Sequence, residues 1–192
     1  MLVLKERITE IPIMSLQTGA QIAVTAEPII DPRELKIVAF YCQGPHLDSS
    51  PAVLHIDDIR EISHLGLIVD DAESIMSPEG LVRLQQVIGF NFTLEGKTVI
   101  EESGRKIGKV TNYTVDTPLF YITQLHVQPS IFRSWGLAEV IIGRNQIKEI
   151  TDSNIVVRSA TVKDRVPAHA RRMAQNPFRN HPQTEATHSN QD

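Results

Sequence analysis

The hydrophobic and polar positions of the chain follow a pattern that occurs twice. Residues 59–69 read IREISHLGLIV and residues 147–157 read IKEITDSNIVV, at a constant offset of 88, and most paired positions are identical or conservatively exchanged. A match at a fixed offset is typical of an internal repeat. The sequence therefore predicts two divergent copies of one small unit.

The match extends toward the N-terminus at smaller offsets. Residues 31–42 lie opposite residues 116–127 at an offset of 85. Near the front, Gly19–Ile22 matches Gly96–Val99 at an offset of 77. We therefore expect the second copy to carry eight extra residues there, within 101–110.

Within each copy, the apolar residues alternate with polar ones or form short runs, as β-strands do. A hairpin is expected at 97–110, with its turn at Ser103-Gly104. The other expected strands are 21–25, 35–42, 52–57 and 67–70 in the first copy, and 110–115, 120–127, 139–142 and 155–157 in the second. Short strands at intervals of about ten residues are typical of a small sandwich or barrel.

One helix is predicted between the copies. Ser77 fits its N-cap and Pro78 its first helical position. An apolar stripe with helical spacing follows, formed by Leu81, Leu84, Val87 and Ile88. We expect this helix to join the two units and to bury its stripe against a barrel rather than against a partner.

The chain then divides into four segments. Residues 1–76 form a divergent first unit with a lead-in, 77–90 a linker helix, 91–162 the second unit, and 163–192 a polar tail. The tail has few apolar residues, so we expect it to be disordered. Units of roughly 70–80 residues are close to the lower limit for independent folding, and packing against each other would stabilise both.

Composition narrows the class of protein. The longest apolar runs are far shorter than the roughly 20 residues that span a membrane, and no signal-peptide pattern begins the chain. The single cysteine, Cys42, excludes an internal disulfide and suits a reducing compartment. We therefore expect a cytoplasmic protein in which Cys42 is a buried apolar residue rather than a nucleophile.

Charge is uneven along the chain. Residues 1–78 hold 5 basic and 12 acidic side chains, whereas residues 79–162 hold 9 and 8. The tail from residue 163 holds 5 basic and 3 acidic side chains. An acidic folded body lacks the basic footprint of general nucleic-acid binding. No direct nucleic-acid binding is expected.

Motifs that carry chemistry are absent from the sequence. It contains no glycine-rich phosphate loop, no G-x-S-x-G and no H-E-x-x-H. His55 and His64 flank Asp57 and Asp58, but a solvated strand end explains them better than a metal site. A second acidic cluster at 70–73 lacks the spacing of a calcium loop. We assign no catalytic residue, cofactor or metal, and we expect the protein not to be an enzyme.

One predicted connection, residues 128–137, holds apolar residues and the single tryptophan. Contact surfaces are enriched in Trp, Phe and Arg. The candidate partner-binding residues are Ile131, Phe132, Arg133, Trp135 and Leu137. Two interpretations stay open, because these side chains could instead fold back over a barrel or pack on the helix of 78–88.

Glycines and β-branched residues recur at defined positions in the second unit. They are Gly96-x-x-Val99, Ser103-Gly104-x-x-Ile107-Gly108-x-Val110 and Val115-Asp116, followed by Ile142, Ile147 and 155–157. Together they resemble a PRC-barrel domain over residues 94–162, and residues 14–75 resemble it more weakly. The first copy lacks the Gly-x-x-Ile-Gly hairpin. The family is named after the cytoplasmic domain of the photosynthetic reaction-centre H subunit, and it includes the C-terminal half of the ribosome maturation factor RimM.

The resemblance implies a mainly β fold of two small PRC-type barrels in tandem. It also implies a non-enzymatic adaptor that docks a protein partner on a barrel surface or between the barrels, although a fold alone does not determine function. The alternative is a ribosome-maturation role in which a barrel engages a ribosomal protein; the acidic body and the missing N-terminal domain of that factor count against it. A third hypothesis is an enzyme or small-molecule carrier that uses the inter-barrel cleft. The sequence leaves a homo-oligomer open.

Overall fold

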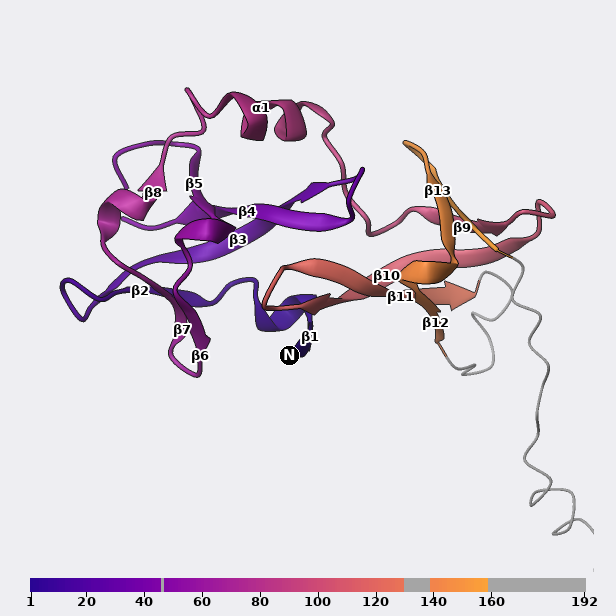
Figure 1. Ribbon diagram of the computed structural model, residues 1–192, viewed down its shortest axis with the longest axis horizontal. Coiled ribbons are helices and arrows are strands. Elements are labelled where there is room, and N and C mark those ends of the chain that lie inside the picture. The colour runs from indigo at the N-terminus through magenta and orange to yellow at the C-terminus, as the bar shows by residue number, and fades with distance from the viewer. Residues whose placement is uncertain (46, 130–138, 159–192) are drawn as a thin grey trace, which may run out of the picture. The chain divides into compact units, whose positions relative to one another are not determined.

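The computed structural model describes residues 1–45, 47–129 and 139–158, and these ranges are mainly β with a single α-helix (Figure 1). They belong to one compact unit, Met1–Ser159. The strands are β1 (Leu2–Leu4), β2 (Pro12–Ser15), β3 (Gln21–Asp31), β4 (Lys36–Gln43), β5 (Ala52–His55), β6 (Glu61–Ser63), β7 (Gly66–Val69), β8 (Ile75–Met76), β9 (Thr98–Glu101), β10 (Lys106–Asp116), β11 (Tyr121–Pro129), β12 (Val140–Gly143), β13 (Ile147–Ile150) and β14 (Asn154–Val157). The helix is α1 (Val82–Gly89).

Strand pairings follow the same order in the two halves of the chain. In the first half, β2, β3, β4 and β5 pair antiparallel in succession, and β7 joins β2 in parallel. In the second half, β9, β10, β11 and β12 pair antiparallel in succession, and β14 joins β9 in parallel. β3 and β10 end at Asp31 and Asp116, the first pair of the segments that the sequence aligned at an offset of 85.

The front hairpins correct one part of that alignment. β2 holds the place in its half that β9 holds in the other, and each is followed by a turn with a glycine in the left-handed region, Gly19 at φ 67° and Gly104 at φ 86°. Gly19 therefore corresponds to Gly104 rather than to Gly96, and the expected eight-residue insertion was wrong. The sequence misled because Gly-x-x followed by a β-branched residue occurs at both Gly96 and Gly104.

The described strands form one sheet with a continuous path of pairings. The order runs β13-β14-β9-β10-β11-β4-β3-β2-β7-β6, with β1, β5, β8 and β12 attached beside it. This path has two ends, so the sheet is open. The mainly β class predicted from the sequence is confirmed, whereas the pairings of the described residues do not amount to two closed barrels.

Helix α1 begins later than the sequence predicted. Its first residue is Val82, and the preceding Leu81 provides no side-chain cap. Gly80 has φ 101°, which is incompatible with a helix running through it. Ser77 instead accepts a hydrogen bond from the N–H of Glu79 in the turn before the helix, at 3.2 Å. The N-terminal boundary at Ser77 and Pro78 was therefore wrong.

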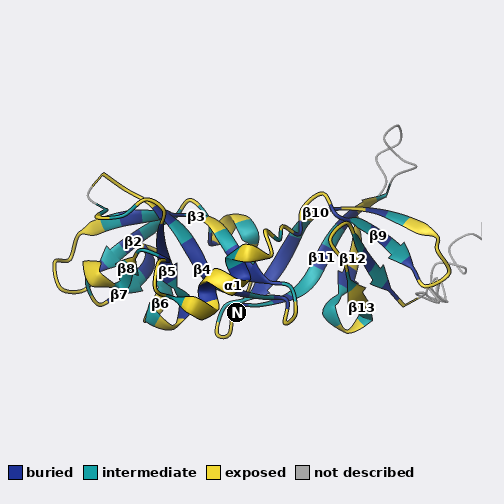
Figure 2. Cartoon of the chain, turned by 90° about the horizontal axis from the view of Figure 1, so that it is seen from above, coloured by how far each residue is buried: buried dark blue, intermediate teal, exposed yellow. Residues whose placement is uncertain are grey.

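The apolar stripe of α1 packs as predicted. Leu84 and Val87 are buried in a cluster with residues of three successive strands, Ile29, Ala39 and Val53. Leu81 and Ile88 are partly buried against the same cluster. The helix therefore covers one face of β3, β4 and β5, and all residues of β4 except the last, Gln43, are buried or intermediate (Figure 2). The predicted burial of the stripe is confirmed, although it lies on an open sheet.

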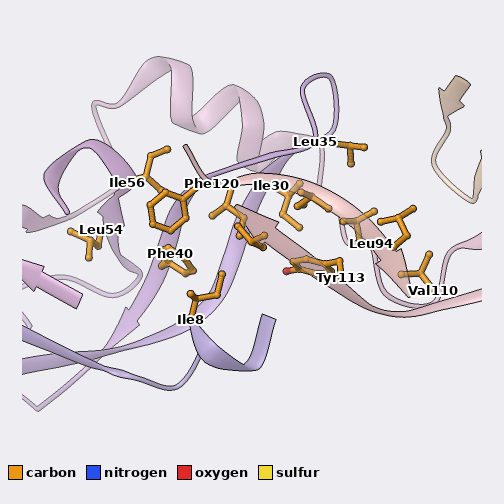
Figure 3. Close-up of a cluster of buried hydrophobic side chains, with 14 of the residues drawn as sticks. Ile8, Ile30, Leu35, Phe40, Leu54, Ile56, Leu94, Val110, Tyr113 and Phe120 are labelled. Carbon is orange, nitrogen blue, oxygen red and sulfur yellow. The ribbon is translucent and has the colours of Figure 1, made fainter. Parts of the chain in front are cut away.

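A larger buried cluster contains residues from both halves. At its centre the ring of Phe40 meets the ring of Phe120 edge to face, with 5.9 Å between centroids (Figure 3). Ile8 and Tyr113 are also almost completely buried in this cluster. Because both halves contribute to one core, we expect them to unfold together.

The halves are joined by a reciprocal pair of main-chain hydrogen bonds. The N–H of Ile37 donates to the carbonyl of Phe120 at 3.0 Å, and the N–H of Ile122 donates to the carbonyl of Leu35 at 2.9 Å. Ile122 and Phe120 lie 85 residues after Ile37 and Leu35, so each half presents the same two positions to the other. This is the pattern of a twofold interface between identical subunits. Leu35 and Phe120 are both buried and both have positive φ, 46° and 57°.

Candidate functional site

The partner-binding residues predicted from the sequence lie outside the described residues. They are Ile131, Phe132, Arg133, Trp135 and Leu137. The strands that come before and after this segment, β11 and β12, are described and pair with each other antiparallel, with His126 opposite Ile141. These two strands and their neighbours form the candidate site.

Strand β12 is the counterpart of β5 at an offset of 88. The two strands differ at the edge that does not pair with β11 or β4. β5 pairs with β4 on one side and with β8 on the other, through Val53↔Met76 and Leu54↔Ile75. β12 pairs with β11, and within the described ranges no strand pairs with its other edge. An unpaired edge presents free N–H and C=O groups that can accept another strand.

Side chains on β12 are exposed where those on β5 are buried. Ile141 is 55% exposed, whereas its counterpart Val53 is fully buried beneath α1. Val140 is 37% exposed, whereas its counterpart Ala52 is buried. The edge of β12 thus combines a strand edge that no described strand pairs with and apolar side chains that meet solvent. At the end of this edge the N–H of Gly143 donates to Oε1 of Gln146 at 2.8 Å.

Two other strands, β6 and β13, lie at the ends of the sheet path. Each carries charge at that end: Glu61 lies in β6, and Lys148 and Glu149 lie in β13. Charged side chains on an edge strand discourage pairing with another chain. β12, which reads Val-Ile-Ile-Gly, has no charged residue. Among these three edges, β12 is the one suited to accept a strand.

A polar network lies beside this edge. His126 on β11 contacts the carboxylate of Glu139 through Nδ1 at 2.8 Å and the hydroxyl of Thr114 through Nε2 at 2.9 Å. The hydroxyl of Thr111 donates to the other oxygen of Glu139 at 3.3 Å. Glu139 immediately precedes β12, so these contacts hold the start of the edge strand in place.

The order of hydroxyl, imidazole and carboxylate resembles the groups used in nucleophilic catalysis. Thr114 is only 8% exposed, which keeps its hydroxyl from a substrate. In the first half, the positions of Thr114 and His126 are taken by Ile29 and Tyr41, which contribute to the apolar cluster beneath α1. The network therefore replaces an apolar, helix-covered face with a polar one. Its geometry suits positioning the start of β12 better than it suits catalysis.

Ile141, His126 and Glu139 were not predicted as site residues from the sequence. Position by position comparison of the two copies holds the signal, because Ile29 becomes Thr114 and Tyr41 becomes His126 at an offset of 85. Such a change indicates that a face with apolar neighbours in one copy has polar neighbours in the other. That reading requires knowing that α1 covers the first copy, which is a tertiary fact.

Two of the residues considered as metal ligands, His55 and Asp70, make other contacts. The Nδ1 of His55 accepts a hydrogen bond from the N–H of Asp57 at 3.3 Å. Asp70 pairs with Arg60 at 2.5 Å, and hydrogen bonds from this guanidinium hold the pKa of Asp70 below its ordinary value. In the described part of the chain, no group of three or more His, Cys, Asp or Glu residues could hold a metal ion.

Cys42 is buried, as predicted. Its side chain lies within the main core cluster, and burial raises the pKa of the thiol to about 12. A thiol with so high a pKa is almost entirely protonated near neutral pH and is therefore a poor nucleophile.

No protein-family model matches the chain, and a search of curated proteins finds no match either. The helices of the described ranges include none that is both long and apolar enough to cross a membrane. The geometry of the β12 edge is therefore the feature from which a function can be inferred.

Proposed function

We propose that the chain is a non-enzymatic adaptor that docks a protein partner on the edge of β12. The observation that carries this proposal is the contrast between β12, whose Ile141 is 55% exposed beside an unpaired edge, and β5, whose edge is covered by β8. A partner segment in extended conformation would pair with Val140–Ile142 through main-chain hydrogen bonds and cover Ile141 with an apolar side chain.

The surroundings of the edge define the chemistry of the partner. Glu139 lies at the start of β12 and accepts hydrogen bonds from Thr111 and His126. An extended segment with an apolar residue opposite Ile141 and a Lys or Arg near Glu139 would match both groups. The residues from Ile131 to Leu137 directly precede this strand in the sequence and would extend the contact surface.

We also propose that the adaptor consists of two PRC-barrel-type units in tandem. The recurring order of strand pairings supports a repeated unit. The Gly-x-x-Ile hairpin, which has a counterpart at Gly19–Ile22 in the first half, supports the resemblance to that family. Both statements concern the backbone, and neither assigns chemistry to a residue.

Capture from source-cell lysate tests the docking proposal. The bait proteins are the wild type, Ile141→Asp, and Leu65→Asp as a matched control, because Leu65 is 54% exposed in the turn between β6 and β7. We expect a partner that the wild type and Leu65→Asp retain and that Ile141→Asp loses. A partner that binds all three baits equally would place docking elsewhere.

A fourth bait, the double variant Phe132→Ala/Trp135→Ala, separates the edge from the predicted segment. Loss of the partner with Ile141→Asp but not with the double variant would confine docking to β12. Loss with both would show that the contact surface includes the residues that the sequence singled out.

A further inference from the structure

A separate cleft lies beneath helix α1, in the first half of the chain. Its volume is about 380 Å³. The polar part of its lining includes Arg33, His55 and Arg83, and the apolar part includes Val38, Leu84 and Val87. Ligand pockets of about 300–1,000 Å³ typically combine an apolar surface with a few polar groups in this way.

Both arginines of this cleft have guanidinium donors outside ion pairs with described residues. Asp31 holds Arg33 through Nε at 3.0 Å and through Nη2 at 2.6 Å, so Nη1 stays outside this ion pair. Arg83 is exposed on α1 and forms no ion pair with any described residue. The Arg33–Asp31 pair also fixes one guanidinium at the rim, which lowers the entropy cost of using it.

The lining of the cleft has a net positive charge, although the first part of the chain is acidic. Residues 1–78 hold 12 acidic and 5 basic side chains, yet two arginines and one acidic residue, Asp31, line this cleft. Val38, Leu84 and Val87 form the apolar side of the lining, and all three belong to the cluster that packs α1 on the sheet. An anion with an apolar body would satisfy both parts of the lining.

We propose that this cleft binds a small amphipathic anion. The anionic group is held by Arg83 and by the free donor of Arg33, with His55 beside them, and the apolar body lies on Val38, Leu84 and Val87. The site is independent of strand docking at β12, because it is formed by α1, β4 and β5 and by the residues around Asp31.

Chemical-shift titration of the ¹⁵N-labelled full chain tests the proposal with three probes. Octanoate has the anion and the apolar body, octanol has the body alone, and inorganic phosphate has the anion alone. We expect octanoate to shift the amides of His55, Arg83 and Val87, and the other two probes to leave them unchanged at equal concentration. Equal shifts from octanol, equal shifts from phosphate, or no shift from octanoate would each overturn the proposal.

Substitutions then locate the anion. Arg83→Ala should weaken octanoate binding about tenfold, the effect of losing one charge-assisted hydrogen bond. Arg7→Ala is the matched control, because Arg7 is an exposed arginine in a different helical turn (Lys5–Arg7). Arg83→Lys should recover part of the affinity. Equal affinity for the Arg83→Ala and Arg7→Ala proteins would contradict the assignment, and the same spectra show that each variant is folded.

Discussion

Replacing Phe120 by alanine and by glycine separates the contribution of its ring from that of its backbone. The ring is 95% buried, since Phe120 is 5% exposed, and it packs edge to face on Phe40 with 5.9 Å between centroids. Deleting a buried phenylalanine ring typically costs about 3–5 kcal/mol of the free energy of unfolding. We expect Phe120→Ala to lie in that range.

Glycine should be the milder of the two substitutions. Phe120 has φ 57°, and the left-handed conformation costs a residue with a Cβ about 1–2 kcal/mol that glycine avoids. Glycine also loses about 0.5–1 kcal/mol through its greater freedom in the unfolded chain. The difference makes Phe120→Gly more stable than Phe120→Ala by roughly 0.5–1 kcal/mol.

The control is Ile122, two residues further on, which is buried in the extended strand β11. There glycine should be less stable than alanine by about 0.5–1 kcal/mol. Urea denaturation followed by circular dichroism gives all four values. If glycine is the less stable substitution at both positions, Phe120 does not have the left-handed backbone conformation described here. Because the core is shared, each variant should unfold in one cooperative transition.

Three further outcomes follow from individual contacts. Gly108→Ala should lower the free energy of unfolding in urea by about 2–3 kcal/mol, because a Cβ there would lie 2.1 Å from the carbonyl oxygen of Gln128. Gly104 has open space around it but a φ of 86°, so Gly104→Ala should lower the free energy of unfolding by about 1–2 kcal/mol. Hydrogen bonds from Arg33 lower the pKa of Asp31 from 3.8. The wild type should therefore be more stable than Asp31→Asn at neutral pH, and this difference should disappear as the pH falls below 3.8. An unchanged difference at pH 2.5 would contradict this reasoning. Cys42, with a pKa of about 12, should resist alkylation at pH 8 until urea unfolds the chain.

The repeat could be predicted from sequence because its later strands keep a constant spacing. Residues 147–157 and 59–69 preserve the offset of 88 through two strands, and the short helical turns before them, 144–146 and 56–58, preserve it too. The front register could not be predicted, since β2 is placed by its parallel pairing with β7, more than 50 residues away. Local motif matching has no access to such a pairing.

The missing glycine of the first hairpin has a physical explanation. In the second half, Gly108 lets the strands approach closely, with Pro129 on the facing strand. In the first half, Ala23 takes the place of Gly108, and the glycine lies instead at Gly44, where a Cβ would come within 3.3 Å of Ala23. Both halves keep the close approach of the two strands, but the glycine that permits it lies on a different strand in each half. A sequence motif that covers one strand therefore matches only one copy.

The contact between the halves at Leu35 and Phe120 and the candidate site could not be predicted from the sequence, for different reasons. Leu35 and Phe120 adopt positive φ without being glycine, asparagine or aspartate, so no residue type marks them. The exposure of Ile141 depends on what covers a neighbouring strand, and its counterpart Val53 has nearly the same chemistry. Apolar pattern alone predicts both residues to be buried.

Hydrogen exchange of the backbone amides in β12 tests the central proposal most directly. It compares the chain alone with the chain bound to the partner retained by the wild type and by Leu65→Asp. Strand addition predicts slower exchange within Val140–Ile142 on binding and unchanged exchange in Glu61–Ser63, at a charged end of the sheet path. Binding that leaves the β12 amides unchanged would contradict docking at this edge.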